Sequence, residues 1–310
     1  EDRVQLFGSY PFSKVSRFEL GTSAASYSYR IDRFSQYYDQ INGIPTYFIG
    51  SDRKKVSLAE ANQFYNNTYG INFQNFRIFG FDAALVGDNS NFGLTAPLNG
   101  YRYRIGINTL MGDFNLSMAT VDLRKYLRLK KITLAGRFLS SMALGGDENQ
   151  FFAQQFIGNP VFIRGYEYNS FYTKGDISSA NGEFSIDQLV GSKIAVANFE
   201  VRLPFTGPKK LTAIESKFLF SDLNAFFDIG LAYNSGSEVS FSSKPKLIGS
   251  VVNQNNQTTE VYSRVPAMSM GLSLRVNVFG YFVIEPYYAI PFQRKNINGG
   301  VFGLTFAPGW

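Results

Sequence analysis

Apolar and polar side chains alternate along segments of about ten residues through most of the chain, and short turns and long polar stretches separate these segments in alternation. Successive side chains of a β-strand point to opposite faces, so each segment has an apolar face and a polar face. The alternation is clearest in residues 195–203, where Ala195, Ala197, Phe199, Val201 and Leu203 interleave with Val196, Asn198, Glu200 and Arg202. This pattern is typical of a transmembrane β-barrel. The lipid-facing apolar belt is expected to include Phe199, Val201, Phe227, Ile229, Leu272 and Leu274.

The pattern predicts about eleven strands, near residues 3–7, 15–29, 70–86, 100–110, 114–126, 131–144, 193–205, 224–234, 265–278, 281–292 and 300–308. We therefore expect an all-β fold, a transmembrane antiparallel β-barrel in which residues 1–310 form one outer-membrane barrel domain. A soluble β-sandwich also alternates, but the alternation of long and short loops favours a barrel. Single-chain bacterial barrels have even strand numbers, so we expect N-terminal strands to be missing from this chain.

Connection lengths assign the strand ends to the two sides of the membrane. The predicted extracellular linkers are 31–69, 145–192 and 235–264, and the predicted periplasmic turns are 9–14, 127–130 and 279–280. The linker 87–99 is long for its periplasmic place. The segment 52–66 is expected to form a short helix within the first long linker, because Ser57 and Glu60 resemble a capping box.

Composition narrows the classes of function. Aromatic residues make up 16% of the chain, which is typical of strands and of membrane interfaces. No segment approaches the ~18 consecutive apolar residues of a transmembrane helix. The chain contains neither Cys nor His, which excludes disulfides, Ser-His and Cys-His nucleophile pairs and the usual zinc sites. We therefore expect no catalytic residue, no metal and no cofactor.

The net charge of +6 does not by itself indicate a nucleic-acid partner. The basic residues are spread through strand-like segments and form neither a helical Lys/Arg face nor an RNA-binding aromatic signature. The charge is expected to face a lumen or anionic lipid, such as lipopolysaccharide, and nucleic acid is not expected as a partner.

The polar linker 145–192 contains an Arg-Gly-Tyr sequence at residues 164–166, flanked by Phe162 and Tyr168. Loops of this length are usually functional or disordered, and disordered segments contain few aromatic residues. We therefore expect a loop that packs against the rest of the protein and carries a buried cation. Gly165 allows the backbone to turn sharply beside that cation.

The alternation places Glu200, Phe226 and Asp228 on the polar faces of neighbouring strands, so these side chains are expected to point into one lumen. Arg164 in the same lumen would form bidentate, charge-assisted hydrogen bonds with the two carboxylates. Either Phe226 or Tyr166 is expected to cover the guanidinium face. Two other interpretations stay open, namely that Arg164 is a solvated loop charge, or that these residues only hold the loop.

Four motifs follow one another along the chain. They are Ile163-Arg164-Gly165-Tyr166, Asn198-Phe199-Glu200-Val201-Arg202-Leu203-Pro204-Phe205, Ala225-Phe226-Phe227-Asp228-Ile229-Gly230 and Phe302-Gly303-Leu304-Thr305-Phe306-Ala307-Pro308-Gly309-Trp310. Together they resemble the outer-membrane insertase and two-partner-secretion superfamily of sixteen-stranded barrels, also called bacterial surface antigens. The second and third motifs are similar to the twelfth strand of that superfamily, with its inward Glu, and to the thirteenth, with its Phe-x-Asp-x-Gly sequence.

The resemblance implies that the chain holds about the last eleven strands of a sixteen-stranded barrel in the bacterial outer membrane. The Arg-Gly-Tyr loop would fold into the barrel as a loop lock, formed by Ile163, Arg164, Gly165, Tyr166, Glu200, Phe226, Asp228 and Gly230. The chain end would be an outer-membrane signal, formed by Phe302, Leu304, Phe306 and Trp310. The implied function is to assemble, insert or translocate unfolded outer-membrane or secreted proteins without enzymatic chemistry. Its further partners would be the lipid bilayer and periplasmic or surface accessory subunits.

A lateral seam is expected at the last strand. Pro291 and Pro308 each remove a donor from the strand ladder, and a weakened seam is open to a client strand by β-augmentation. Pro308 is equally compatible with a simple strand end. Two other functions remain open, a passive porin and a membrane anchor for a missing periplasmic enzymatic or binding domain.

Overall fold

The computed structural model describes residues 1–41, 44–70, 72–159, 162–174, 182–252, 258–294, 297 and 299–306. The chain divides into two compact units, both built mainly from β-strands. One unit comprises Glu1–Leu6, Thr22–Gly80 and Leu110–Phe114. The other comprises Phe7–Gly21, Phe81–Thr109 and Asn115–Trp310.

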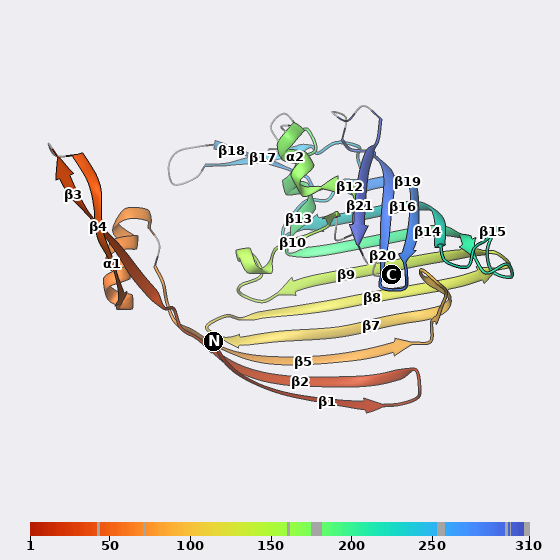
Figure 1. Cartoon of the computed structure of the whole chain (residues 1–310), viewed down its shortest axis with the longest axis horizontal. Coiled ribbons are helices and arrows are strands. Elements are labelled where there is room, and N and C mark those ends of the chain that lie inside the picture. The colour runs from red at the N-terminus through yellow and green to blue at the C-terminus, as the bar shows by residue number, and fades with distance from the viewer. Residues whose placement is uncertain are drawn as a thin grey trace. The chain divides into compact units, whose positions relative to one another are not determined.

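Most strands belong to one large sheet (Figure 1). Eleven of them follow one another in chain order: β1 (Asp2–Pro11), β2 (Ser16–Tyr27), β5 (Phe76–Asp88), β7 (Pro97–Gly112), β8 (Leu116–Leu129), β9 (Ile132–Leu144), β14 (Lys193–Gly207), β16 (Phe220–Tyr233), β19 (Ala267–Val278), β20 (Phe282–Pro291) and β21 (Val301–Phe306). The short strands β6 (Asn91–Phe92) and β15 (Ile214–Glu215) pair with β7 and β14. From β8 to β21 each strand is antiparallel to the next. The prediction of an all-β, antiparallel fold is confirmed.

The predicted strands correspond one to one with these eleven, but some boundaries differ. The strand expected from residue 70 begins at Phe76. Gly70 instead ends helix α1 (Leu58–Tyr69), with a left-handed φ of 68° that favours glycine. The strand expected from residue 224 begins at Phe220, because its first residues already pair with β19. Among the described residues, β1 and β21 are the two ends of the strand order.

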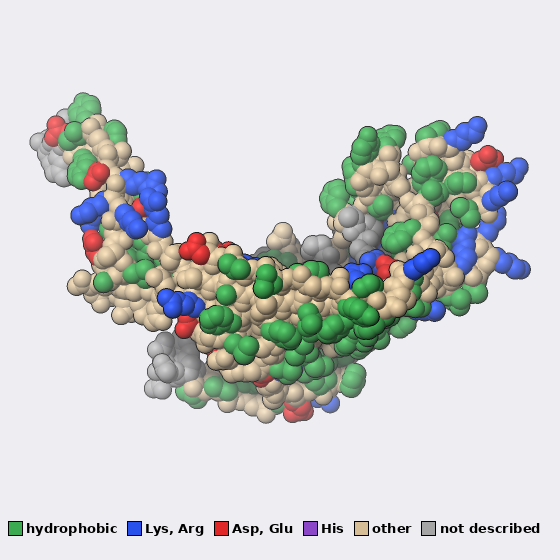
Figure 2. Space-filling view, turned by 90° about the horizontal axis from the view of Figure 1, so that it is seen from below, with side chains coloured by type: hydrophobic (Ala, Val, Ile, Leu, Met, Phe, Trp, Pro, Cys, Tyr) green, Lys and Arg blue, Asp and Glu red, His purple; other side chains and the backbone are tan. Residues whose placement is uncertain are grey.

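The strand register decides which side chains share a face. Glu200 pairs with Phe226, and Phe199 pairs with Phe227, so the two pairs lie on opposite faces. Glu200 is 2% exposed and Phe199 is 54% exposed. The other residues predicted for the apolar belt share the face of Phe199 and are exposed or half-buried, namely Val201, Phe227, Ile229, Leu272 and Leu274. The predicted register is therefore correct, and Figure 2 shows hydrophobic side chains gathered over the face of the sheet in view.

The linker 145–192 is folded rather than irregular. Its elements are η1 (Phe151–Ala153), β10 (Gln155–Phe156), β11 (Gly158–Asn159), β12 (Ile163–Glu167), α2 (Tyr168–Lys174), η3 (Ile186–Leu189) and β13 (Val190–Gly191). It packs on the sheet through a hydrophobic cluster that joins the loop residues Ile157, Ile163, Tyr166, Phe171 and Leu189 to Leu139, Ile194, Val196 and Ala232. Burial of this apolar surface stabilises the loop against the sheet. No helix in the described part of the chain has the length and apolarity needed to cross a membrane.

The other long linkers also contain secondary structure. Strands β17 (Leu247–Val252) and β18 (Thr258–Tyr262) form a hairpin within 235–264. Within 31–69, strands β3 (Ile31–Ile41) and β4 (Ile44–Val56) form a hairpin that precedes α1.

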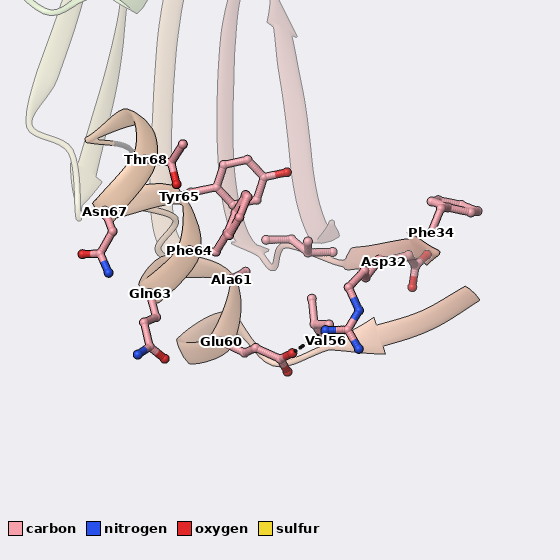
Figure 3. A pocket seen from close by; sticks show the side chains of 12 residues that line it. Asp32, Phe34, Val56, Glu60, Ala61, Gln63, Phe64, Tyr65, Asn67 and Thr68 are labelled. Atoms are coloured by element: carbon pink, nitrogen blue, oxygen red, sulfur yellow. Dashed lines mark hydrogen bonds and ion pairs between the residues drawn. The ribbon is translucent and has the colours of Figure 1, made fainter. Parts of the chain in front are cut away.

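The helix predicted for residues 52–66 is present but its bounds are wrong, since α1 spans Leu58–Tyr69. Residues 52–56 belong to β4, where pairing with residues 31–35 overrides local helix propensity, and α1 begins at Leu58. Ser57 is the N-cap as predicted, and it accepts a hydrogen bond from the Glu60 N–H (3.2 Å). The Glu60 carboxylate binds Arg33 of β3 (3.3 Å). A pocket of about 760 Å³ lies between α1 and the hairpin (Figure 3).

Candidate functional site

Strand β12 brings the Arg-Gly-Tyr sequence to the lumenal face of the sheet, the face that carries Glu200 and Asp228. It lies against β16, β19 and β20. Ile163 and Tyr166 are fully buried, and Arg164 is 7% exposed. The loop therefore presents a cation to the sheet in a position that water hardly reaches.

The Arg164 guanidinium holds Asp228 of β16 in a bidentate contact. Its Nε donates to Asp228 Oδ2 and its Nη2 donates to Asp228 Oδ1, both at 2.8 Å. The backbone N–H of Arg164 also donates to Asp228 Oδ2 (3.2 Å). A fork of two parallel, charge-assisted hydrogen bonds fixes the orientation of the side chain as well as its position.

The third guanidinium nitrogen of Arg164 reaches two further strands. Its Nη1 donates to Glu200 Oε1 of β14 (2.8 Å) and to Glu285 Oε1 of β20 (3.0 Å). Arg202 donates to Glu200 Oε2 (2.7 Å). Arg275 bridges the two glutamates, with 2.9 Å to Glu200 and 2.9 Å to Glu285.

We call this set the arginine network, which consists of Arg164, Arg202, Arg275, Glu200, Asp228 and Glu285. Its three cations and three carboxylates balance, and all six residues are buried. Asn198 and Ser273 donate further hydrogen bonds to Asp228 Oδ1 (2.9 Å) and Glu285 Oε1 (2.6 Å). Burial of such a network carries a desolvation penalty. Removal of one partner lowers the stability by about 3–5 kcal/mol, because it leaves an uncompensated buried charge.

The two aromatic candidates have different roles. Phe226 covers the guanidinium, with Arg164 Cζ 3.6 Å from its ring centroid, so the cation–π expectation holds for this residue. Tyr166 does not cover Arg164. Its hydroxyl lies 2.9 Å from the Met268 carbonyl oxygen and accepts the Gln293 N–H (3.3 Å), which ties the loop to β19 and to the segment after β20.

Two glycines make room for this arrangement. Gly165 has a φ of 88°, in the left-handed region that side chains rarely adopt. Gly230 lies beneath the loop, where a Cβ atom would come within 2.6 Å of Ile163 Cδ1 and 3.2 Å of Val196 Cγ2. The small size of Gly230 therefore allows Ile163 to seat against β16.

The linker 87–99 reaches the same face of the sheet from the opposite end of the strands. The Leu94 carbonyl oxygen accepts a hydrogen bond from Asn277 Nδ2 (2.6 Å), and the Thr95 hydroxyl donates to buried Asp222. The Pro97 carbonyl oxygen accepts a hydrogen bond from Arg202 Nη1 (3.4 Å). The unusual length of this turn is thus explained, because it folds onto the lumenal face and contacts the arginine network.

The structure brings together the residues of the predicted loop lock, and sequence reasoning missed four of their partners. Arg202, Arg275 and Glu285 complete the network, and Asn198 supports Asp228. Each occupies a lumenal position in the alternation, which was the available signal. The partnership itself depends on strand neighbours that the sequence does not specify.

The described residues of the predicted C-terminal signal contribute no side chain to the arginine network, although β21 also contacts β12. Phe302, Leu304 and Phe306 are on β21 and are 82%, 51% and 67% exposed. Trp310 and Pro308 lie outside the described residues. Pro291 ends β20, paired with Ser269. In the described residues, no group of acidic side chains is arranged to hold a metal ion.

Antiparallel strands with one apolar and one polar face, together with a long loop folded onto the polar face, are typical of a transmembrane β-barrel protein. The sequence matches the Omp85 superfamily domain over residues 3–309, and the protein belongs to this superfamily. None of the curated proteins matches the chain. Members of the superfamily are outer-membrane proteins of Gram-negative bacteria that insert or translocate proteins and are not enzymes.

Proposed function

We propose that this protein assembles, inserts or translocates other proteins at the outer membrane, with the loop 145–192 as a lock on the inner wall of the barrel. The observation that carries the proposal is the contact of Arg164 with carboxylates on three strands, β14, β16 and β20. A single loop side chain thereby joins the neighbouring strands β14 and β16 to β20, which lies beyond β19 in the sheet. Movement of the loop would have to break several buried, charge-assisted bonds together, which is the property of a two-state latch.

The proposal places the client at a lateral seam formed by an edge strand. An edge strand carries unpaired N–H and C=O groups, which can pair with an extended segment of another protein. β21 is the last strand in the order, and Pro286 in the preceding strand leaves the pairing between β19 and β20 incomplete beside Glu285. The seam would therefore lie close to the part of the sheet that holds Arg164.

The eleven strands are proposed to form the C-terminal part of a sixteen-stranded barrel, supported by the order of the four sequence motifs. Periplasmic domains and accessory subunits are proposed as partners that deliver clients. The lipid bilayer, anionic lipid and unfolded outer-membrane or secreted proteins complete the set of partners.

A passive porin is the second candidate function. The polar face supports it, but a porin does not require a charge-balanced network that holds a loop and a turn against the wall. Single-channel conductance of the reconstituted full-length protein separates the two. A large, steady pore favours the porin, and small, intermittent currents favour the lock.

The proposed function is tested by depleting the full-length protein in its own bacterium and expressing Arg164→Ala in its place. Quantitative mass spectrometry of the outer-membrane and surface proteins identifies the clients without assuming them. We expect a defined subset of these proteins to fall in both strains while the variant itself reaches the membrane at normal levels. An unchanged protein inventory after depletion would rule out the assembly function.

A further inference from the structure

We infer that the membrane-facing surface of β7, β8, β9 and β14 carries a binding site for one anionic phospholipid. The site is a groove of about 470 Å³ on the face of the sheet opposite the arginine network. The inference rests on the barrel spanning a membrane and does not depend on how the protein handles clients.

A missing side chain creates the groove. Gly136 of β9 pairs with Lys125 of β8 on one side and with Phe199 of β14 on the other, so these three positions share the outer face. A Cβ atom at Gly136 would touch only the Phe199 ring, at 3.8 Å, which leaves a hollow between the neighbouring side chains. Leu123, Phe138 and Ala197 continue the groove along the strands. An apolar channel of this kind suits an acyl chain.

Lys125 gives the groove a charge. It is exposed on the apolar face, and its ammonium lies 5.7 Å from the Tyr101 ring centroid at one end of the groove. Asp122 of the same strand points to the opposite face, where it binds Arg124 and Arg137. A Lys on the lipid face of a barrel is unfavourable unless an anion or the interface compensates it.

The position of Lys125 fits a phosphate at the membrane interface. It stands four residues before the end of β8, near the short turn to β9, and the groove runs from this level toward the opposite end of the strands. A Lys side chain extends its ammonium toward the interface while its methylene groups stay on apolar surface. The headgroup phosphate would bind Lys125, and one acyl chain would lie over Gly136 between Leu123, Phe138 and Phe199.

This end of the sheet carries the turns predicted to be periplasmic. The occupant is therefore a phospholipid of the periplasmic leaflet, and its phosphate supplies the charge complementary to Lys125. Phosphatidylglycerol is a suitable probe, because its headgroup is anionic, whereas phosphatidylcholine with the same acyl chains has no net charge.

The test is native mass spectrometry of the purified full-length protein titrated with each lipid. We expect the wild type to prefer phosphatidylglycerol, and Lys125→Ala to weaken its binding by about tenfold, as for loss of one charge-assisted contact. Lys125→Arg should retain the preference. Gly136→Leu fills the groove without changing the charge and should weaken the binding of both lipids.

Lys210 provides the matched control, since it is an exposed lysine in the turn between β14 and β16, at the same end of the sheet. Lys210→Ala should bind like the wild type, and all variants should show the same heat-modifiable gel mobility as a folding check. Equal losses of phosphatidylglycerol binding in Lys125→Ala and Lys210→Ala would overturn the proposed site. They would show that the lipid responds to the overall surface charge. Unchanged lipid binding in Gly136→Leu would overturn the proposal that an acyl chain lies in the groove. Displacement of the lipid by inorganic phosphate alone would overturn it as well.

Discussion

Arg164 and Asp228 are 64 positions apart in the sequence and are joined by two parallel hydrogen bonds of 2.8 Å, Nε to Oδ2 and Nη2 to Oδ1. Asp228 is fully buried, and among the described residues Asn198 also donates a hydrogen bond to it. Glu200 and Glu285 share Arg164 with other cations, so the three carboxylates do not depend on it equally.

Arg164→Ala should release the loop 145–192 from the sheet. Glu200 keeps two cations after this substitution, because Arg202 and Arg275 still bind it. The unpaired charge is Asp228, and the cost is about 3–5 kcal/mol for a buried pair. Limited proteolysis near Asn159 should be faster than in the wild type. Arg164→Lys keeps the charge without the fork and should restore only part of the protection.

The double variant Arg164→Ala/Asp228→Ala should be much less defective than the sum of its single variants. Both residues belong to one contact, and removal of the second relieves the unpaired charge left by the first. The measured quantity is the free energy of loop opening from protease or hydrogen-exchange protection. Fully additive effects would show that the two residues act separately.

Gly230→Val should displace the loop although no charge is altered. The added side chain would overlap Ile163 and Val196, and overpacking of this kind costs about 1–3 kcal/mol. Cleavage near Asn159 is again the measurement. Gly249→Ala is the control, because no atom lies within 4 Å of the new Cβ position in β17. A Gly230→Val protein with normal loop protection would contradict the seating of Ile163 on β16.

Phe226→Leu tests the ring above the guanidinium. The substitution keeps an apolar side chain but removes the cation–π contact with Arg164, a loss of about 0.5–2 kcal/mol. Loop protection should decrease less than in Arg164→Ala. Phe226→Tyr retains a π-face and should stay close to the wild type. Protection equal to wild type in Phe226→Leu would exclude a role for the ring.

Thr95→Val should loosen the turn that contacts Asp222. The change keeps the shape of the side chain but removes the hydroxyl donor to a buried carboxylate, at a cost of about 1–3 kcal/mol. The chain contains no Cys, so Ala96→Cys provides a single thiol at a position that is 3% exposed. Maleimide should label this thiol faster in the Thr95→Val background. Thr120→Val removes a hydroxyl contact in β8 and should leave the labelling rate unchanged.

The sequence by itself determined which face each strand residue occupies. Alternation is a local property of an extended chain, so the lumenal positions of Glu200 and Asp228 and the outward position of Phe199 follow from parity alone. The sequence also predicted the Ser57 N-cap, because a cap involves only residues three positions apart. The Arg-Gly-Tyr sequence indicated a packed loop with a cation because aromatic residues flank it, and disordered segments contain few of these.

Only the tertiary structure decided which of these residues meet. Glu285 and Arg275 come together through the register of β19 with β20, and Tyr166 is turned toward Met268 by the packing of the whole loop. The start of α1 moved because residues 52–56 pair with residues 31–35 across a hairpin. In each case the deciding interaction joins residues that are distant in the chain, and the free energy of such contacts depends on neighbours that periodicity does not identify.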